Sequence, residues 1–352
     1  DGIYSKTLNS SLLVANKNYK IVVFGSAEGF SEPVPVTFFI TINPLDTQIS
    51  VYDYTTQTNY TSNEGSAFWN EMINFTVFYY RSGDFIDGKL KGATLNYIWD
   101  YGSGAILQDP IKSEGYYFFQ INTSHSPNVG KYQIKISAQL QNYTTITNFG
   151  FFLNILARPT SINGTTTLQY ISQSIWIEQE FNFTFEYIDT LIDLRIGDLE
   201  EANYQWYEIG LDGIPLTVPS SSINLFEADN SLYILDFNTA LRKAGQYAIF
   251  VTLQKYNYEV RNVMLNLRIR EREFDSVLTA TNLQGSQISI VQGNNIDFTL
   301  QLMDITRDNV PLNDATVKLV IADQEYRFNM TSNGIYEYSF STSDIEAFFA
   351  AQ

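Results

Sequence analysis

Asparagine followed two residues later by serine or threonine is the pattern in this sequence with the most direct chemical meaning. An exported chain can carry an N-linked glycan at each such asparagine. A chain rich in Asn, Ser and Thr also forms the pattern by chance, so we expect a glycan on at least one site rather than on all. The eight candidate asparagines are Asn9, Asn59, Asn74, Asn122, Asn142, Asn163, Asn182 and Asn329.

Acidic residues gather in three loops that fall between the same two strands of a repeating pattern, at 83–88, 189–201 and 304–314. Carboxylate oxygens are hard ligands that suit Ca²⁺. None of these loops has the spacing of an EF-hand, and aspartate in a turn commonly caps its own backbone. We therefore expect no cofactor, with Ca²⁺ at these loops as the alternative.

Residues suited to catalysis are sparse. His125 is the single histidine and the chain has no cysteine, which excludes thiolate zinc sites and sites built from several histidines. The G-x-S-x-G turn of serine hydrolases, the P-loop and the dinucleotide-binding fingerprint are all absent. A carboxylate pair of the glycosidase type stays open. We expect no enzyme, and we assign no catalytic, cofactor-binding or metal-binding residue.

The composition argues against several classes of protein. The 352 residues carry a net charge of −17 with only 21 basic side chains, so a nucleic-acid partner is not expected. No apolar run in the segment is long enough to cross a bilayer. Its first residues do not resemble a signal peptide, which fits a mature or excised segment as well as a cytosolic protein. Aromatic residues make up 15%, which is unlike a disordered chain.

An internal repeat organises the chain. The stretches GKYQIKISAQLQNY at 130–143 and GQYAIFVTLQKYNY at 245–258 share one pattern, and a fainter copy begins at Asn18. Their tyrosines, Tyr19, Tyr132 and Tyr247, are 113 and 115 residues apart. Alternating apolar positions after each tyrosine indicate strands, and a period of this length indicates tandem β domains.

Seven short strands per repeat, separated by Gly, Asn, Asp and Pro turns, predict an all-β fold of tandem immunoglobulin-like antiparallel sandwiches. Gly2-Ile3-Tyr4 opens a strand that matches Gly334-Ile335-Tyr336, about three repeats later. We therefore expect two whole domains between two incomplete ones, joined end to end as a rod. The segments are 1–45 (last strands), 46–157 (whole), 158–270 (whole) and 271–352 (first strands).

In each predicted strand, we expect every second residue to face the core. Trp69, Trp99, Trp176 and Trp206 recur in step with the repeat, so we expect them in core or edge packing rather than in a carbohydrate platform. The other core residues that we expect are Phe75, Val77, Leu95, Phe118, Ile134 and Leu153 in the first whole domain, and Phe183, Phe185, Tyr204, Ile234, Ile249 and Leu265 in the second.

These motifs resemble the tandem Ig-like repeats of archaeal and bacterial cell-surface proteins, including surface-layer components and adhesin stalks. The residues that carry the resemblance are an F-x-V/F-x-Y…W run over 75–99 and Gly-x-Tyr-x-Ile/Val at Gly130 and Gly245. The tyrosine of this second motif resembles the tyrosine corner of Ig-like folds. The resemblance implies an extracellular, cell-surface glycoprotein, of archaeal type, that forms part of a filament, surface layer or stalk.

Two other functions remain open, a carbohydrate-binding or protein-binding adhesin region and a non-catalytic region of a larger secreted enzyme. In the adhesin, loops at one pole of a terminal domain would hold the ligand, so an unrepeated aromatic cluster exposed at one end would favour it. We expect the partner to be either a second copy or an adjacent repeat. In the first case, residues 1–45 of one copy complete residues 273–352 of the next, head to tail. In the second case, neighbouring repeats of a longer chain complete both halves.

Overall fold

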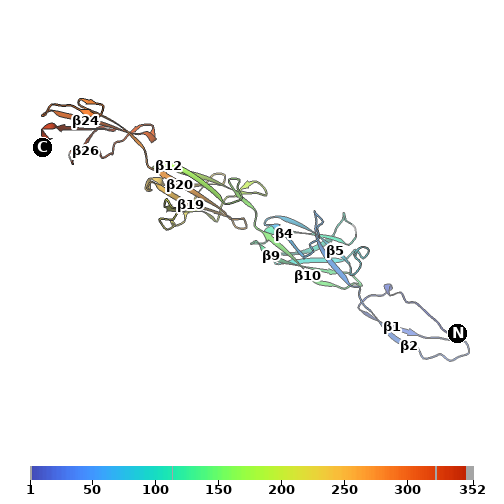
Figure 1. Cartoon of the computed structure of the whole chain (residues 1–352). Coiled ribbons are helices and arrows are strands. Elements are labelled where there is room, and N and C mark those ends of the chain that lie inside the picture. Colours follow the sequence, from blue (N-terminus) through green and yellow to red (C-terminus); the bar gives the residue numbers. More distant parts are fainter. Residues whose placement is uncertain (1, 113, 322, 346–352) are drawn as a thin grey trace. The chain divides into compact units, whose positions relative to one another are not determined.

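The computed structural model describes residues 2–112, 114–321 and 323–345 (Figure 1). The fold is all-β, as predicted, and its helices in these ranges are single 3₁₀ turns. None of these helices has the length and apolar character that a bilayer span requires. The chain divides into two compact units. Unit 1 comprises Asp1–Thr160, Asp189–Leu194 and Gln254–Val260, and unit 2 comprises Ser161–Ile188, Arg195–Leu253 and Arg261–Gln352.

The first strands of unit 1 form an antiparallel hairpin of β1 (Lys17–Val23) and β2 (Val36–Ile42). A single 3₁₀ turn, η1 (Ser10–Leu12), precedes it. The prediction of a strand at residues 2–4 was wrong, because these residues pair with no described strand. An extended segment without a ladder partner has nothing to hold it as a strand.

The first sandwich is one continuous eight-stranded sheet in the order β3-β5-β8-β7-β6-β9-β10-β4. Strand β7 pairs with β8 on one side and with β6 on the other, so it joins the two layers. The strands are β3 (Thr47–Asp53), β4 (Glu64–Phe68), β5 (Met72–Arg81), β6 (Thr94–Trp99), β7 (Gly102–Gln108), β8 (Tyr116–Asn122), β9 (Gly130–Gln139) and β10 (Ile146–Leu156).

Alternation places the core of the first sandwich between its layers. Phe75 and Val77 of β5 are fully buried, as are Ile134 and Leu153, and Leu95 is 1% exposed, all as predicted. Phe118 does not belong to this core, because its neighbours Tyr117 and Phe119 occupy the inward positions of β8. All four residues from Tyr116 to Phe119 are aromatic, so the facing is marked only by the next residue, the exposed Gln120, which shares a face with Phe118.

The second sandwich has two separate sheets. One has the order β11-β13-β18-β17, with β14 beside β13, and the other has the order β12-β20-β19-β15-β16. The strands are β11 (Thr160–Ile162), β12 (Gln169–Trp176), β13 (Phe181–Asp189), β14 (Leu194–Arg195), β15 (Glu201–Ile209), β16 (Ile223–Asn224), β17 (Phe226–Ala228), β18 (Leu232–Phe237), β19 (Gly245–Gln254) and β20 (Arg261–Arg270).

The core of this second sandwich confirms most of the predicted positions. Phe185 and Ile249 are fully buried, Leu265 is 1% exposed and Tyr204 is 5% exposed. Two predictions were wrong. Ile234 lies on the opposite face of β18 from the buried Tyr233 and Leu235, and Phe183 is only half-buried on β13, where Phe181 and Phe185 fill the core.

Among the described residues, both sandwiches contain a parallel strand pair between an early strand and the final strand. Strand β4 runs parallel to the last strand β10, from Glu64 beside Phe152 to Phe68 beside Leu156. Strand β12 runs parallel to β20 in the same way, from Gln169 beside Val263 to Trp176 beside Arg270. Each sandwich therefore closes with an early strand hydrogen-bonded to its final strand.

The terminal strands form one sheet in the order β21-β24-β29-β28, with β25 beside β24, and two separate hairpins, β22-β23 and β26-β27. A small core contains Ile296, Phe298 and Phe340. The strands are β21 (Phe274–Ala280), β22 (Leu283–Gln284), β23 (Gln287–Ile288), β24 (Asn295–Asp304), β25 (Val310–Pro311), β26 (Lys318–Ile321), β27 (Gln324–Arg327), β28 (Asn329–Ser332) and β29 (Ile335–Ser341).

Candidate functional site

A tyrosine near the start of one strand marks the same hairpin in each repeat, which we call the closing hairpin (β1–β2, β9–β10 and β19–β20). The hydroxyl of Tyr132 donates to the carbonyl of Asn128 at 2.7 Å, and that of Tyr247 donates to the carbonyl of Lys243 at 2.9 Å. Both are tyrosine corners, as predicted. In β1–β2 the hydroxyl of Tyr19 accepts from the Val14 N–H at 2.7 Å and donates to the Val14 carbonyl at 3.3 Å.

The inward face of β1–β2 is open where its counterpart is closed. The facing pair Val251 and Val263 in β19–β20 is fully buried. The corresponding pair in β1–β2, Val23 and Val36, is 54% and 64% exposed. Large apolar areas left in water are unfavourable and mark interaction surfaces. This face is therefore a candidate binding surface.

The terminal strands are open on the complementary side. In the second sandwich the closing hairpin supplies β19, which pairs with β15. The counterpart of β15 in the terminal strands is β26, which pairs with β27 alone among the described strands. The inward residues of β26, Leu319 and Ile321, pack against the small core but are only half-buried, and Val320 on the outer face is 60% exposed. In the described range, the terminal strands thus have the early strands of a sandwich without a closing hairpin.

The open segments overlap at one place in the repeat. A 3₁₀ turn follows an asparagine cap at η1, at η2 (Thr123–His125) and at η3 (Thr239–Leu241). The equivalent turn η5 (Thr342–Ile345) follows β29, with Ser341 in place of the asparagine. Residues 2–12 therefore repeat what 334–345 already supply. The part that the terminal strands lack corresponds to residues 13–42, the closing hairpin and its approach.

Tyr4 shows how much burial depends on partner strands. Its counterparts Tyr117, Tyr233 and Tyr336 are between 1% and 2% exposed. Each counterpart donates its hydroxyl hydrogen to a backbone carbonyl. Tyr4 itself is 95% exposed. In the described structure, no strands cover Tyr4 as they cover its counterparts.

The tips of the closing hairpins share one turn. The N–H of Tyr143 donates to Leu140 at 3.2 Å and that of Tyr258 donates to Lys255 at 3.0 Å. The residue before each tyrosine, Asn142 or Asn257, has a left-handed φ of 70° or 64°. Asparagine tolerates this conformation better than most residues. The turn thus presents an aromatic ring after a left-handed residue.

Each of these tips makes the same backbone bonds within unit 1. The N–H of Leu45 donates to the carbonyl of Asn142 at 3.0 Å, and the N–H of Thr144 returns to Leu45 at 2.8 Å. At the second tip Arg158 takes the place of Leu45, donating to Asn257 at 2.9 Å and accepting from Glu259 at 3.0 Å.

The asparagine side chains of the two tips add a second contact. The Asn142 Oδ1 accepts from the N–H of Ala15 at 2.9 Å, and the Asn257 Oδ1 accepts from the N–H of Val129 at 3.0 Å. The Asn257 amide also donates to the carbonyl of Pro127 at 3.0 Å. Val129 directly precedes its closing hairpin, whereas Ala15 lies two residues before the first residue of β1, so the two contacts are similar but shifted by one residue.

Side chains complete the contact at the second tip. The Tyr258 ring meets the Trp69 ring edge-on, with centroids 6.0 Å apart. The Arg158 guanidinium donates to the carbonyl of Trp69 at 3.2 Å and forms an ion pair with Asp189. Burial raises the pKa of Tyr258, and the nearby Asp189 charge adds to this effect.

The predicted glycosylation sites differ in exposure. Asn74 is half-buried on β5, with its Oδ1 buried and without a partner. Asn122 and Asn142 are also half-buried, and their oxygens accept backbone hydrogen bonds. The side chains with exposed positions are those of Asn9, Asn59, Asn163, Asn182 and Asn329. Whether any site carries a glycan stays a prediction.

The acidic loops use their aspartates locally. Asp84 pairs with Arg81 and accepts the N–H of Asp87 at 3.0 Å, and Asp304 accepts the N–H of Thr306 at 2.9 Å. Within residues 2–112, 114–321 and 323–345, no three His, Cys, Asp or Glu side chains are grouped as a metal site requires. His125 is exposed at the end of η2.

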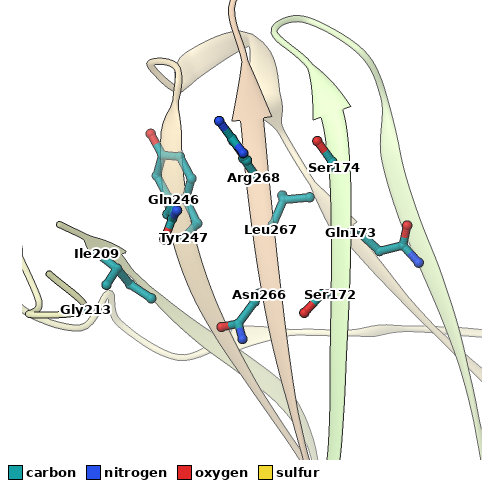
Figure 2. A pocket seen from close by; sticks show the side chains of 10 residues that line it. All are labelled: Ser172, Gln173, Ser174, Ile209, Gly213, Gln246, Tyr247, Asn266, Leu267 and Arg268. Carbon is teal, nitrogen blue, oxygen red and sulfur yellow. The ribbon is translucent and has the colours of Figure 1, made fainter. Parts of the chain in front are cut away.

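Unit 2 has a hollow of about 540 Å³ with a mixed polar and apolar lining on the second sandwich. Figure 2 shows that its side chains come from β12, β19 and β20, with Ile209 and Gly213 at one side. Ser172, Asn266 and Arg268 contribute hydroxyl, amide and guanidinium groups. The hollow can therefore form hydrogen bonds but offers no carboxylate.

The outer face of β3, β5 and β8 carries an aromatic cluster that sequence reasoning missed. Phe78 stacks against Tyr80 and Tyr116, with centroids 4.9 and 4.7 Å away, and Phe85 lies 5.0 Å from it. The outward side chains of β13 in the second sandwich are Asn182, Thr184 and Glu186 in place of aromatic rings. The cluster is therefore not a requirement of the fold.

The tryptophans are in step with the repeat only in part. Trp99 and Trp206 are equivalent, each next to its corner tyrosine, with centroids 6.1 and 5.9 Å from it. Trp69 and Trp176 are one position out of step. The N–H of Trp69 donates to the last residue of β10, and it is Ile177, not Trp176, that makes this bond to β20.

The solved structures that resemble this chain do so at low sequence identity and low TM-score. No family model and no curated protein matches the chain. The structure of titin domains A168–A170 has 9% identity and a TM-score of 0.34, over 83% of this chain and 87% of that one. A 1.5-MDa bacterial ice-binding adhesin has 9% identity and a TM-score of 0.25, over 87% and 90%. The fold is tandem Ig-like β-sandwiches, as the strand order and corner tyrosines indicate.

Proposed function

We propose that this chain is part of an extracellular structural repeat protein, in a surface filament, surface layer or stalk. Its role is to supply length and attachment rather than catalysis. The single observation that carries this proposal is the pair of open, complementary surfaces on β1–β2 and on the terminal strands. The absence of any cysteine and the charge of −17 support a packed, soluble surface segment that needs no cross-links.

The open surfaces are completed by strands of the same repeat type. A hairpin added to the terminal strands would pair with β26 and cover the apolar side of that layer, which is strand addition of a known kind. The added hairpin comes from a second copy or from an adjoining repeat. Addition between copies joins different surfaces, so it propagates head to tail rather than closing a dimer.

Exposure at the cell surface is tested on intact host cells. Brief protease treatment of unbroken cells should release peptides from this chain, identified by mass spectrometry. Peptides that appear only after the cells are lysed would refute the extracellular assignment. A cytoplasmic marker protein measured in the same digest serves as the control for lysis.

Strand addition between copies is tested by truncation. The full chain should sediment as a concentration-dependent series of species, and a chain without residues 1–45 should stay monomeric. Filaments of unchanged repeat from the truncated chain would rule out exchange between copies and leave adjoining repeats as the source of the hairpin.

A second candidate function is binding of carbohydrate by the first sandwich. The specific observation that favours it is the unrepeated aromatic cluster around Phe78, Tyr80 and Tyr116, in which Phe78 is buried, the two tyrosines are half-buried and Phe85 is 51% exposed. Aromatic rings with hydroxyl groups suit a sugar, which has an apolar face and polar edges. Binding of the purified chain to an array of glycans tests it. Loss of that binding in Tyr116→Ala would support the candidate, and unchanged binding would count against it.

A further inference from the structure

The two filled hairpin contacts of unit 1 have a third, unfilled counterpart in unit 2. Arg272 follows Arg158 by 114 residues, as Arg158 follows Leu45 by 113. Its partner Asp304 ends β24, as Asp189 ends β13. Among the described residues, no hydrogen bond reaches the backbone N–H or carbonyl of Arg272. These two groups are the ones that Leu45 and Arg158 use to hold a hairpin tip.

The side chains of Arg272 and Asp304 also lack the hydrogen bond that Arg158 and Asp189 form. The Arg158 Nε donates to the Asp189 Oδ2. The equivalent atoms, Arg272 Nε and Asp304 Oδ2, are both buried without a hydrogen-bond partner. The nearest approach of this second pair is 3.7 Å, from another nitrogen of Arg272. Unpaired buried polar atoms are costly, so a partner that reorganises them is favoured.

Unit 2 also provides the counterparts of the remaining contact groups. Ile177 takes the place of Trp69, since each donates its N–H to the end of the final strand, at 2.9 Å. Ala244 directly precedes β19, as Val129 precedes β9. A cavity of about 600 Å³ opens beside Arg272, lined also by Trp176 and Gln179. In the filled contact of unit 1, the Tyr258 ring packs against Trp69, the counterpart of Ile177.

The β1–β2 hairpin has a tip of the matching kind. The N–H of Phe30 donates to the carbonyl of Ala27 at 3.2 Å, which is the turn found at Tyr143 and Tyr258. Gly29 precedes it with a left-handed φ of 83°. The Phe30 side chain is 80% exposed, whereas Tyr258 packs against a tryptophan. The β1–β2 tip therefore has the same turn and an aromatic ring, Phe30, but among the described residues this ring packs against no partner comparable to Trp69.

We infer that Arg272, Ile177 and Ala244 form the docking site for the tip of a closing hairpin, and that β1–β2 of a second copy fits it. Phe30 takes the place of Tyr258 against Ile177. Gly29 accepts the Arg272 N–H, and the N–H of Ser31 donates to the Arg272 carbonyl. This inference rests on the proposed strand addition and specifies its register.

The register makes a prediction at Gly29. Glycine has no side chain to accept the Ala244 N–H, as Asn257 accepts that of Val129. Asparagine tolerates the left-handed conformation, and no atom lies within 4 Å of the position of an added Cβ. The substitution Gly29→Asn should therefore strengthen docking, whereas Gly29→Ala adds a side chain without an acceptor and should not.

The test measures binding of a fluorescein-labelled synthetic peptide, residues 13–42, to the full chain by fluorescence anisotropy. Phe30→Ala in the peptide should weaken binding about tenfold or more, because the ring loses its buried contact. Phe24→Ala is the matched control, since Phe24 lies outside the turn and should change binding less than about threefold. Gly29→Asn should tighten binding about threefold to tenfold, as one added hydrogen bond allows.

Two outcomes separate this inference from the proposed function. A peptide that binds equally well with Phe30→Ala, Phe24→Ala and Gly29→Asn would overturn the docking register and leave strand addition standing. A peptide that does not bind at all would overturn both the docking register and strand addition by a second copy. Ile177→Ala in the chain should weaken binding of the unmodified peptide and not that of the Phe30→Ala peptide, and additive losses would contradict the contact.

Discussion

Arg158 and Asp189 form an ion pair whose side chains are only 4% and 2% exposed. A buried charge without its partner keeps its desolvation cost and loses the compensating attraction. Asp189→Asn should therefore lower the free energy of unfolding by about 3–5 kcal/mol, measured by urea denaturation. The matched control is Glu64→Gln, which removes the partner of Lys131 in a pair whose side chains are 40% and 49% exposed. It should cost less than about 1 kcal/mol, and equal losses would contradict the argument.

Adjacent phenylalanines on β8 provide a second test. Phe119 is 3% exposed in the core, while Phe118 points to the outer face of the sheet. Phe119→Ala should destabilise the first sandwich by about 3–5 kcal/mol, because it removes a buried ring and leaves a cavity. Phe118→Ala should cost clearly less in the same denaturation experiment. The reverse order would mean that the strand has the opposite facing.

The corner tyrosines should contribute through their hydroxyl groups. Tyr132→Phe keeps the ring and removes the 2.7 Å bond to the carbonyl of Asn128. We expect a loss of about 0.5–1.5 kcal/mol in unfolding free energy, the usual value for one hydrogen bond. Tyr170→Phe, at a residue that is 67% exposed, serves as control and should have no measurable effect.

Alkaline pH should weaken the first sandwich through Tyr60. Burial, the Asp53 charge and a hydrogen bond to Asp53 raise the pKa of Tyr60 from 10.0 to about 12. The folded state therefore resists ionisation that the unfolded state undergoes near pH 10, so this stabilisation is complete below pH 10 and is lost between pH 10 and about 12. Unfolding measured from pH 9 to 12 should show a shallower decline in Tyr60→Phe. An identical decline in both proteins would exclude this role.

Glycan occupancy should follow exposure. Mass spectrometry of material from the native host should find sugar on at least one exposed site, with the loop residue Asn163 favoured over the half-buried Asn74. Asn74 serves as the internal comparison, because its Oδ1 is buried within the sheet. Unmodified peptides that cover all eight sites would count against an exported glycoprotein.

The period and the strand type could be predicted from sequence, because Tyr132 and Tyr247 each begin a long alternating run. The facing of β8 and β18 is harder to predict, because the first four residues of each strand are all apolar or aromatic. The signal lies further along each strand, where the polar Gln120 shares a face with Phe118 and Asp236 shares a face with Ile234. The prediction of Phe118 and Ile234 as core residues missed this signal.

The hairpin-tip contacts were harder to find in the sequence. Asn142-Tyr143 and Asn257-Tyr258 are visible as a repeated pair, but Gly29-Phe30 shares neither residue type with them. What the three tips share is a left-handed backbone followed by an aromatic ring. The pairing of Arg158 with Asp189 gave no signal either, because 31 residues separate the two and no local periodicity connects them.

The parallel pairs β4–β10 and β12–β20 have a mechanical consequence. In each sandwich an early strand is bonded to the final strand, in the same direction along the chain. Tension applied between the entry and exit of such a sandwich drags the two strands lengthwise past each other. The ladder is then loaded in shear, so its hydrogen bonds bear the force together instead of opening one after another like a zipper. A segment built this way resists extension by its hydrogen-bond geometry alone, without a covalent cross-link.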